Sequence, residues 1–251
     1  MSRDDVTGRE REFHDHLHTA GGRERTTRFY SVTDVSRAYY TGLVLDGADG
    51  LSVLEYGCGS GSQAFDLARR GASVDAIDIS EAAITRARET ARAGSVKGVS
   101  FHVMDAQDLD FRDSSFDRVC GSGILHHLDL EAALTEVARV LRPQGTAVFF
   151  EPMGHNPLIN LYRRGTPDLR SVDEHPLRMA DLRLAEGYFE EVRPRFFHLS
   201  TLAAVPLHRF PGQARLAAMF DGVDRFMFRI VPWLRRLAWI VVIELGSPRK
   251  Q

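Results

Sequence analysis

Three glycines at alternating positions follow a short apolar run and could bring the backbone against a ligand. The segment 53–61 is Val-Leu-Glu-Tyr-Gly-Cys-Gly-Ser-Gly, and a helical pattern follows it directly. Because glycine has no Cβ, such a turn allows a ligand to approach the main chain closely. The pattern is typical of nucleotide-type sites, but the same spacing also occurs in plain turns.

Acidic residues follow the next two apolar runs and favour the ligand-binding interpretation. Asp78 ends the second run 21 positions after Gly57, close to the ~20-residue offset at which an acid reaches ribose hydroxyls. An N-cap role is the alternative for Asp78, but Ser80 is the better cap for the following helix. Asp105 occupies the corresponding place after the third run. We therefore expect a ligand site at one edge of a sheet.

The glycine turn lacks the residues that are typical of dinucleotide and phosphate sites, which limits the kinds of ligand that it could bind. Counting from Gly57, the last position of a G-x-G-x-x-G dinucleotide loop is Ser62, and no tyrosine has a lysine four residues later. A phosphate-binding G-x-x-x-x-G-K-[ST] loop is also absent from the sequence. An NAD(P)-dependent oxidoreductase is thus a disfavoured alternative. A cofactor-binding protein without catalytic activity is a second alternative.

Short apolar runs alternate with amphipathic stretches, which predicts βαβ units and an α/β fold with a mostly parallel sheet. A mostly helical, hydrophobic insertion separates an extended run at 192–199 from the last strand at 237–245. Earlier in the chain, Pro, Gly and Arg are frequent over residues 152–179, which predicts an irregular loop above the sheet. The expected strands are residues 51–56, 73–78, 99–104, 116–120 and 146–150, and the expected helices are 63–70, 80–93 and 130–141.

The composition indicates one large globular domain or a domain with a small appendage. The chain has 251 residues, 43% of them hydrophobic, and 32 Lys+Arg balance 34 Asp+Glu, which shows no nucleic-acid footprint. Cys58 and Cys120 have no CxxC spacing, so a reducing cytoplasm is the expected compartment. The N-terminus is polar, with no secretory signal pattern, and the apolar run 226–245 is interrupted by arginines and a proline, so we expect no stable membrane insertion.

The ordered set of motifs over residues 50–151 resembles the class I S-adenosylmethionine-dependent methyltransferases, particularly their small-molecule branch. The motifs are Glu55 with the glycine turn, Asp78, Asp105-Ala106, Phe116-Asp117, Leu125-His126-His127-Leu128 and Leu141-Arg142-Pro143-Gln144-Gly145, in which Gln144 stands where many relatives have glycine. The resemblance implies a Rossmann-like doubly wound sheet with an antiparallel last strand. It also implies S-adenosylmethionine as cofactor, a ligand without phosphate whose hydroxyls and amines need carboxylates rather than a basic loop.

The resemblance assigns cofactor contacts along the chain. The methionine portion would meet Glu55 and the glycine turn, and the ribose would meet the end of the second strand. Adenine would meet the residues after the third strand, and residues 121–124 would line the sulfonium side. An N-terminal helix with Tyr30 would close over the site. The implied cofactor-binding residues are Glu55, Gly57, Cys58, Gly59, Gly61, Asp78, Ile79, Asp105, Ala106, Gly121, Gly123 and Tyr30.

Methyl transfer chiefly requires positioning and, for some acceptors, a base that removes a proton. Candidates at the ends of the fourth and fifth strands are His126, His127, Glu151 and His155. Adjacent residues are not expected to face one pocket together, and the resemblance favours His127. Packing or a local hydrogen bond is the alternative role. A cation site from His155, Asp173, Glu174 and His175 is conceivable, but we expect no metal.

Three regions are expected along the chain: an N-terminal helical cap (1–48), a cofactor-binding core (49–151) and a C-terminal half (152–251). The C-terminal half would supply a substrate lid and an insertion, residues 201–235, rich in apolar residues and arginine. The insertion could wall an apolar substrate pocket, form a homodimer face or contact a membrane surface, in that order of preference. The expected substrate is a small hydrophobic molecule, as in specialised metabolism, with an O, N or C acceptor.

Overall fold

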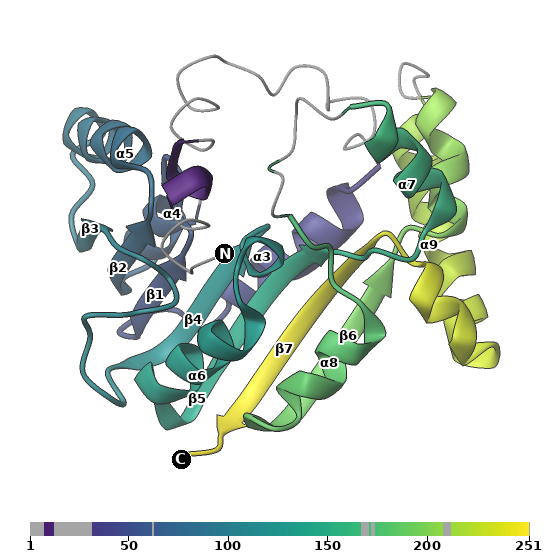
Figure 1. Cartoon of the computed structure of the whole chain (residues 1–251). Helices are drawn as coiled ribbons and strands as arrows, with labels where there is room; N and C mark the ends of the chain where they lie inside the picture. Colours follow the sequence, from purple (N-terminus) through teal and green to yellow (C-terminus); the bar gives the residue numbers. More distant parts are fainter. Residues whose placement is uncertain are drawn as a thin grey trace.

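A computed structural model describes residues 8–12, 32–61, 63–166, 171, 174–207 and 212–250. Its centre is a seven-stranded sheet in the order β3-β2-β1-β4-β5-β7-β6 (Figure 1). Only β7 runs antiparallel to its neighbours, β5 and β6. The expected fold class, including the antiparallel last strand, is therefore confirmed. The strands are β1 (Ser52–Tyr56), β2 (Ser73–Asp78), β3 (Val99–Val103), β4 (Phe116–Ser122), β5 (Leu141–Pro152), β6 (Phe189–Phe197) and β7 (Ile240–Pro248).

The strand order reverses between β1 and β4. From β1 the chain proceeds outward to β2 and β3, and then returns to place β4 on the other side of β1. The carboxyl ends of β1 and β4 lie side by side, with Tyr56 paired to Gly121. In open α/β sheets ligands bind outside the strand ends at such a reversal. The topology thus directs attention to this edge.

Helices cover both faces of the sheet, so alternate strand residues are buried in two separate cores. Leu54 packs with α6 and α8 on one face, whereas Val53 packs with α3, α4 and α5 on the other. The helices are α3 (Asp34–Leu45), α4 (Ala64–Arg69), α5 (Glu81–Ala93), α6 (Leu130–Val140), α7 (Pro157–Arg164), α8 (Met179–Ala185) and α9 (Gln213–Ile230), with 3₁₀ turns η2 (Leu125–His127), η4 (Ser200–Leu207) and η5 (Pro232–Leu237).

Two local expectations were wrong. The loop expected at 152–179 contains the helix α7, because the Asn156 side chain accepts hydrogen bonds from the amides of Leu158 (3.0 Å) and Ile159 (3.2 Å). Pro157 at the first helical position adds a favourable φ. The last strand begins at Ile240 rather than at residue 237, since η5 occupies the preceding residues. Within the part of the chain described, no helix is long and apolar enough to cross a membrane.

His198 lies fully buried where β6 ends. Its Nε2 is 2.7 Å from the hydroxyl of Ser36, which in turn donates to the carbonyl of Thr33 at 2.9 Å. The imidazole N–H therefore donates to Ser36 and joins α3 to the end of β6. Burial lowers the pKa of His198 to about 4, against a weaker raising effect of Asp224.

We predict that acid weakens the fold through His198. The pKa of histidine in the unfolded chain is about 6.5, so between pH 6.5 and 4 the unfolded state binds the extra proton. Stability present above pH 6.5 is then lost as pH falls toward 4, by on the order of 3 kcal/mol from this residue. Urea unfolding followed by circular dichroism at several pH values measures the loss.

The variant His198→Asn is the comparison, because φ at this position is +66° and asparagine tolerates that conformation. It should be less stable than the wild type at pH 7, but the difference should shrink on acidification. Parallel losses in both proteins would show that His198 titration contributes nothing.

Candidate active site

The glycine turn after β1 is as tight as its spacing predicts. Gly57 and Gly61 have φ of +72° and +96°, where side chains with a Cβ are strained. A Cβ at Gly57 would lie 2.8 Å from the Ile124 side chain, and one at Gly61 would lie 2.6 Å from the Phe65 ring. The main chain is therefore the surface that this turn presents.

Glu55 determines the shape of the turn. Its carboxylate is 2% exposed and accepts hydrogen bonds from the amides of Gln63 (2.9 Å) and Ala64 (2.7 Å), which precede and begin α4. A buried carboxylate requires such donors. Glu55, which was expected to contact the methionine portion of the cofactor, thus positions the backbone of the glycine turn.

Asp78 ties the end of β2 to the same turn. One carboxylate oxygen accepts from the amide of Gly59 at 2.7 Å and the other from the amide of Ser80 at 2.9 Å. Ser80 itself caps α5 through Ala83, as the sequence predicted. Cys58 is buried and its amide donates to the carbonyl of Ile77. Asp78 and the half-buried Ile79 therefore lie at the reversal point of the sheet.

The residues after β3 join this edge. Ala106 is buried, and its carbonyl accepts a hydrogen bond from the hydroxyl of Tyr56 at the end of β1. Asp105 accepts from the amide of Gln107 at 2.8 Å. The structure thus brings the glycine turn, Asp78 and Asp105 to neighbouring strand ends.

Glycines at the end of β4 complete the close approach. A Cβ at Gly121 would lie 2.9 Å from both the Ile124 side chain and the carbonyl of Tyr56. The amide of Gly123 donates to the carbonyl of Phe150 in β5, 2.8 Å away. This backbone leads directly into η2, which carries the two histidines.

Glu151, at the end of β5, holds the start of η2. It has no exposed surface, and one oxygen accepts from the amides of Ile124 and Leu125, both at 2.9 Å. The other oxygen is 2.7 Å from Nδ1 of His126. Burial lowers the pKa of His126, and His127 lowers it further, against the raising effect of Glu151. The neutral ring therefore donates its Nδ1–H to Glu151 and keeps a lone pair on Nε2.

Both histidines belong to one cluster, in which Nδ1 of His126 meets the buried Glu151 and Nδ1 of His127 meets Glu10. Their ring centroids are 4.1 Å apart, and the ring planes are inclined by 38°. Nδ1 of His127 lies 3.1 Å from the carboxylate of Glu10, in the short helix of residues 8–12 at the top of Figure 1 (purple). Ligand atoms of His126, His127 and Glu174 lie within 4.8 Å of one another, so this group could also hold a cation.

Other predicted residues lie apart from this cluster or outside the described residues. His155 lies exposed between β5 and α7, and no hydrogen bond or ion pair among the described residues joins it to the histidine pair. Tyr30 and Asp173 lie outside the described residues. Glu10 was not predicted, because nothing in its local sequence relates it to a histidine 117 positions away.

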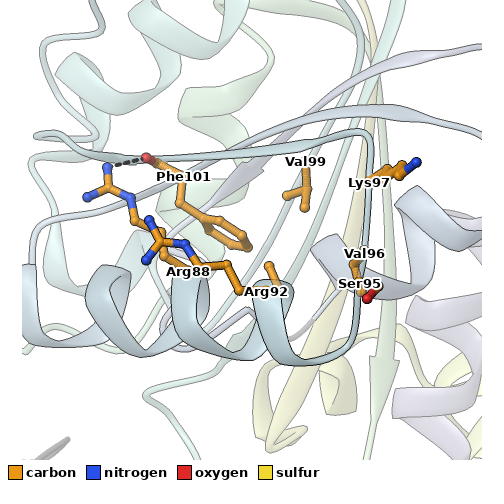
Figure 2. Close-up of a pocket in the computed structure, with 8 residues that line it drawn as sticks. Arg88, Arg92, Ser95, Val96, Lys97, Val99 and Phe101 are labelled. Carbon is orange, nitrogen blue, oxygen red and sulfur yellow. Dashed lines mark hydrogen bonds between the residues drawn. The ribbon is translucent and has the colours of Figure 1, made fainter.

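A hollow in the surface near β3 is separate from the site. It is lined by residues 88–101, where Arg88 donates to the carbonyl of Phe101 at 2.6 Å (Figure 2). Most of its lining precedes or begins β3, so it opens toward the amino end of that strand. The acids and histidines described above are at the carboxyl ends, which are the opposite edge.

Comparison with known proteins agrees with this geometry. Residues 54–149 match the family described as a methyltransferase domain. Methyltransferase GfsG of Streptomyces halstedii is 39% identical over 104 residues, which is 40% of this chain and 37% of that protein. The fatty-acid O-methyltransferase of Mycolicibacterium smegmatis is 35% identical over 161 residues, 62% of this chain and 54% of that protein.

A solved structure from a study of the conversion of a disulfide bond into a thioacetal group during echinomycin biosynthesis is also similar. It is 31% identical, has a TM-score of 0.52, and the match covers 63% of this chain and 71% of that one. A doubly wound sheet with a glycine turn and acids at its reversal point defines a nucleotide-type cofactor-binding protein. Within that class, the chain belongs to the class I S-adenosylmethionine-dependent methyltransferases.

We predict that Gly61→Ala weakens binding of S-adenosylhomocysteine at least about tenfold, because the added methyl meets the Phe65 ring and the backbone conformation is unfavourable for alanine. Isothermal titration calorimetry measures the affinity. The control is Gly42→Ala, at a helical position where a Cβ has no neighbour within 4 Å. If both variants bind like the wild type, the turn is not part of the cofactor site.

Proposed function

We propose that the chain binds S-adenosylmethionine at this edge and transfers its methyl group to an oxygen of a small, hydrophobic molecule. One observation carries the proposal. A glycine turn without room for side chains, the acids Asp78 and Asp105, and a carboxylate-held histidine pair meet at the sheet reversal. The similarity to the fatty-acid O-methyltransferase of Mycolicibacterium smegmatis supports an oxygen acceptor. The substrate is a proposal also because the chain covers only about half or less of its curated relatives.

The donor set fits this cofactor. Asp78 and Asp105 are carboxylates that can accept hydrogen bonds from hydroxyl and amino groups, whereas the described part of the turn has no basic residue for a phosphate. Gly57 and Gly61 offer bare backbone at the place proposed for the methionine portion. When bound, S-adenosylmethionine supplies an electrophilic methyl group on a sulfonium.

The chain's own residues would then orient the acceptor and take its proton. Glu151 fixes the η2 backbone and His126, so His126 is proposed as a positioning residue. His127 is proposed as the base. Its carboxylate partner, Glu10, comes from the N-terminal segment and would orient the ring and stabilise its protonated form. We propose that no metal takes part and that His155 has at most an outer role.

We also propose a cytoplasmic location and a division of the chain into three regions. Cys58 and Cys120 are free and buried, which suits a cytoplasmic protein. The division into a cap (1–48), a cofactor core (49–151) and a C-terminal half (152–251) agrees with the placement of the site residues in the middle segment. Specialised metabolism is the proposed setting.

Calorimetric titration tests the cofactor. S-adenosylhomocysteine and S-adenosylmethionine should bind, and NAD(P) should not, because the amides at the start of α4 already donate to Glu55 and the described part of the turn has no basic residue. Incubation with labelled S-adenosylmethionine and hydrophobic hydroxyl or carboxyl acceptors then tests transfer. Binding of NAD(P) without binding of S-adenosylhomocysteine would overturn the proposal.

Replacement of the base should reduce turnover without affecting the cofactor. We predict that His127→Ala lowers kcat about 10²–10⁴-fold, the range for loss of general base catalysis, with unchanged affinity for S-adenosylhomocysteine. Recovery of the rate at high pH, where hydroxide replaces the base, would distinguish proton removal from positioning. Unchanged turnover would remove His127 from the mechanism.

An excess of chelator should have no effect on activity. Loss of activity would instead favour a cation at His126, His127 and Glu174.

A further inference from the structure

Helix α9 packs Ala217 and Phe228 inward, but it also exposes a row of large apolar side chains while its two acids are buried. Asp221 and Asp224 are 4% and 1% exposed, whereas Met219, Phe226 and Ile230 are 57%, 64% and 60% exposed. A surface helix ordinarily has the reverse arrangement, with its charged face toward water. Such an orientation requires contacts that hold the helix in place and a partner that covers the exposed apolar side chains.

The orientation is held by Asp224. Its carboxylate accepts hydrogen bonds from the amides of Leu199 (3.0 Å) and Ser200 (2.7 Å) and from the hydroxyl of Thr201 (2.7 Å). Rotation of α9 would leave a buried carboxylate without these donors, which is costly. The outward face is therefore a fixed property of the fold.

The outer side carries a continuous apolar stripe. The side chains are spaced alternately four and three residues apart, so they line one side of the helix and continue into η5. All are between 41% and 64% exposed. The α9 stripe consists of Met219, Val223, Phe226, Ile230 and Trp233.

Arginines flank the stripe. Across residues 213–237, all of which are described, the exposed charged side chains are Arg215, Arg225, Arg229 and Arg236. The acids of that stretch are the buried Asp221 and Asp224. Asp221 forms an ion pair with Arg225 at 3.2 Å. The outer face of α9 and η5 thus combines apolar side chains with a net positive charge, to which Arg215, Arg229 and Arg236 contribute.

The charge decides which partner fits. A second copy joined by a two-fold axis through this face would bring arginines together without acids from the same face to pair with them. An anionic lipid surface would pair with the arginines while Phe226, Ile230 and Trp233 enter the boundary of the acyl chains. We propose that the α9 stripe and its arginines dock the protein on an anionic bilayer surface, as a peripheral contact independent of the proposed methyl transfer.

Vesicle co-sedimentation tests the docking. The protein should bind vesicles of phosphatidylcholine mixed with phosphatidylglycerol, bind vesicles of phosphatidylcholine alone much more weakly, and dissociate with added salt. Trp233 supplies a second measurement, because it is 61% exposed whereas Trp239, the other tryptophan, is 4% exposed. Its emission should shift to the blue on binding, and Trp233→Phe should abolish the shift.

Paired variants separate charge from apolar contact. Arg229→Glu with Arg236→Glu should lower partitioning about tenfold or more, since each cation near an anionic surface contributes roughly 1 kcal/mol. Phe226→Ser with Ile230→Ser should weaken it similarly. The charge-matched control, Arg112→Glu with Arg183→Glu, changes exposed arginines away from α9 and should bind like the wild type.

Three results would overturn the proposal: no binding to anionic vesicles, equal binding to neutral vesicles, or a dimer in analytical ultracentrifugation that Phe226→Ser dissociates. Titration with S-adenosylhomocysteine in every variant keeps this outcome distinct from failure of the proposed function. Unchanged binding of S-adenosylhomocysteine with lost vesicle binding supports a separate docking face. Loss of both S-adenosylhomocysteine binding and vesicle binding would indicate that the variant is misfolded. In that case the proposal is tested with Trp233→Phe, the smallest of these changes, through the loss of the blue shift.

Discussion

The arrangement of the site depends on the burial of one carboxylate. Glu151 has no exposed surface, so its charge must be satisfied by the protein itself. It obtains donors from the first amides of η2 and from His126. Those contacts hold the start of the 3₁₀ turn after β4 and one ring of the histidine pair, whose centroids are 4.1 Å apart. The position of the His126 ring thus depends on a buried acid that lies in a different strand.

Buried carboxylates that accept hydrogen bonds from backbone amides are found at two other places. Glu55 binds the amides of Gln63 and Ala64 beside the glycine turn, and Asp224 binds amides at the start of η4. In each case a buried acid from a strand or helix holds irregular backbone from another segment. Backbone amides outside regular elements would otherwise lack partners. These acids therefore give loops the rigidity that a binding site requires.

Much of the cofactor edge could be predicted because its signals are local. The glycine turn, Asp78 and the Ser80 cap follow from residue types within a few positions of a strand end, and parallel strands bring such ends together. The partnership of Glu10 with His127 could not be predicted, because no periodicity relates segments so distant in the chain. The orientation of α9 was equally hidden. Its pattern has acids and apolar residues on opposite sides, and only the tertiary bonds of Asp224 show that the acids face inward.

The docking face and the site are joined by one short stretch of chain. Glu151 ends β5, and the following residues lead to Asn156, which caps α7. The side chain of Asn156 also donates to the carbonyl of Leu237, at the end of η5, at 2.7 Å. Leu158 and Leu161 of α7 are 63% and 67% exposed, so the hydrogen bond of Asn156 links two elements that both expose apolar side chains. The proposed membrane contact is nevertheless separate from the proposed methyl transfer, because its side chains lie on α9 and η5 whereas the acids and histidines of the site lie at the carboxyl ends of the strands.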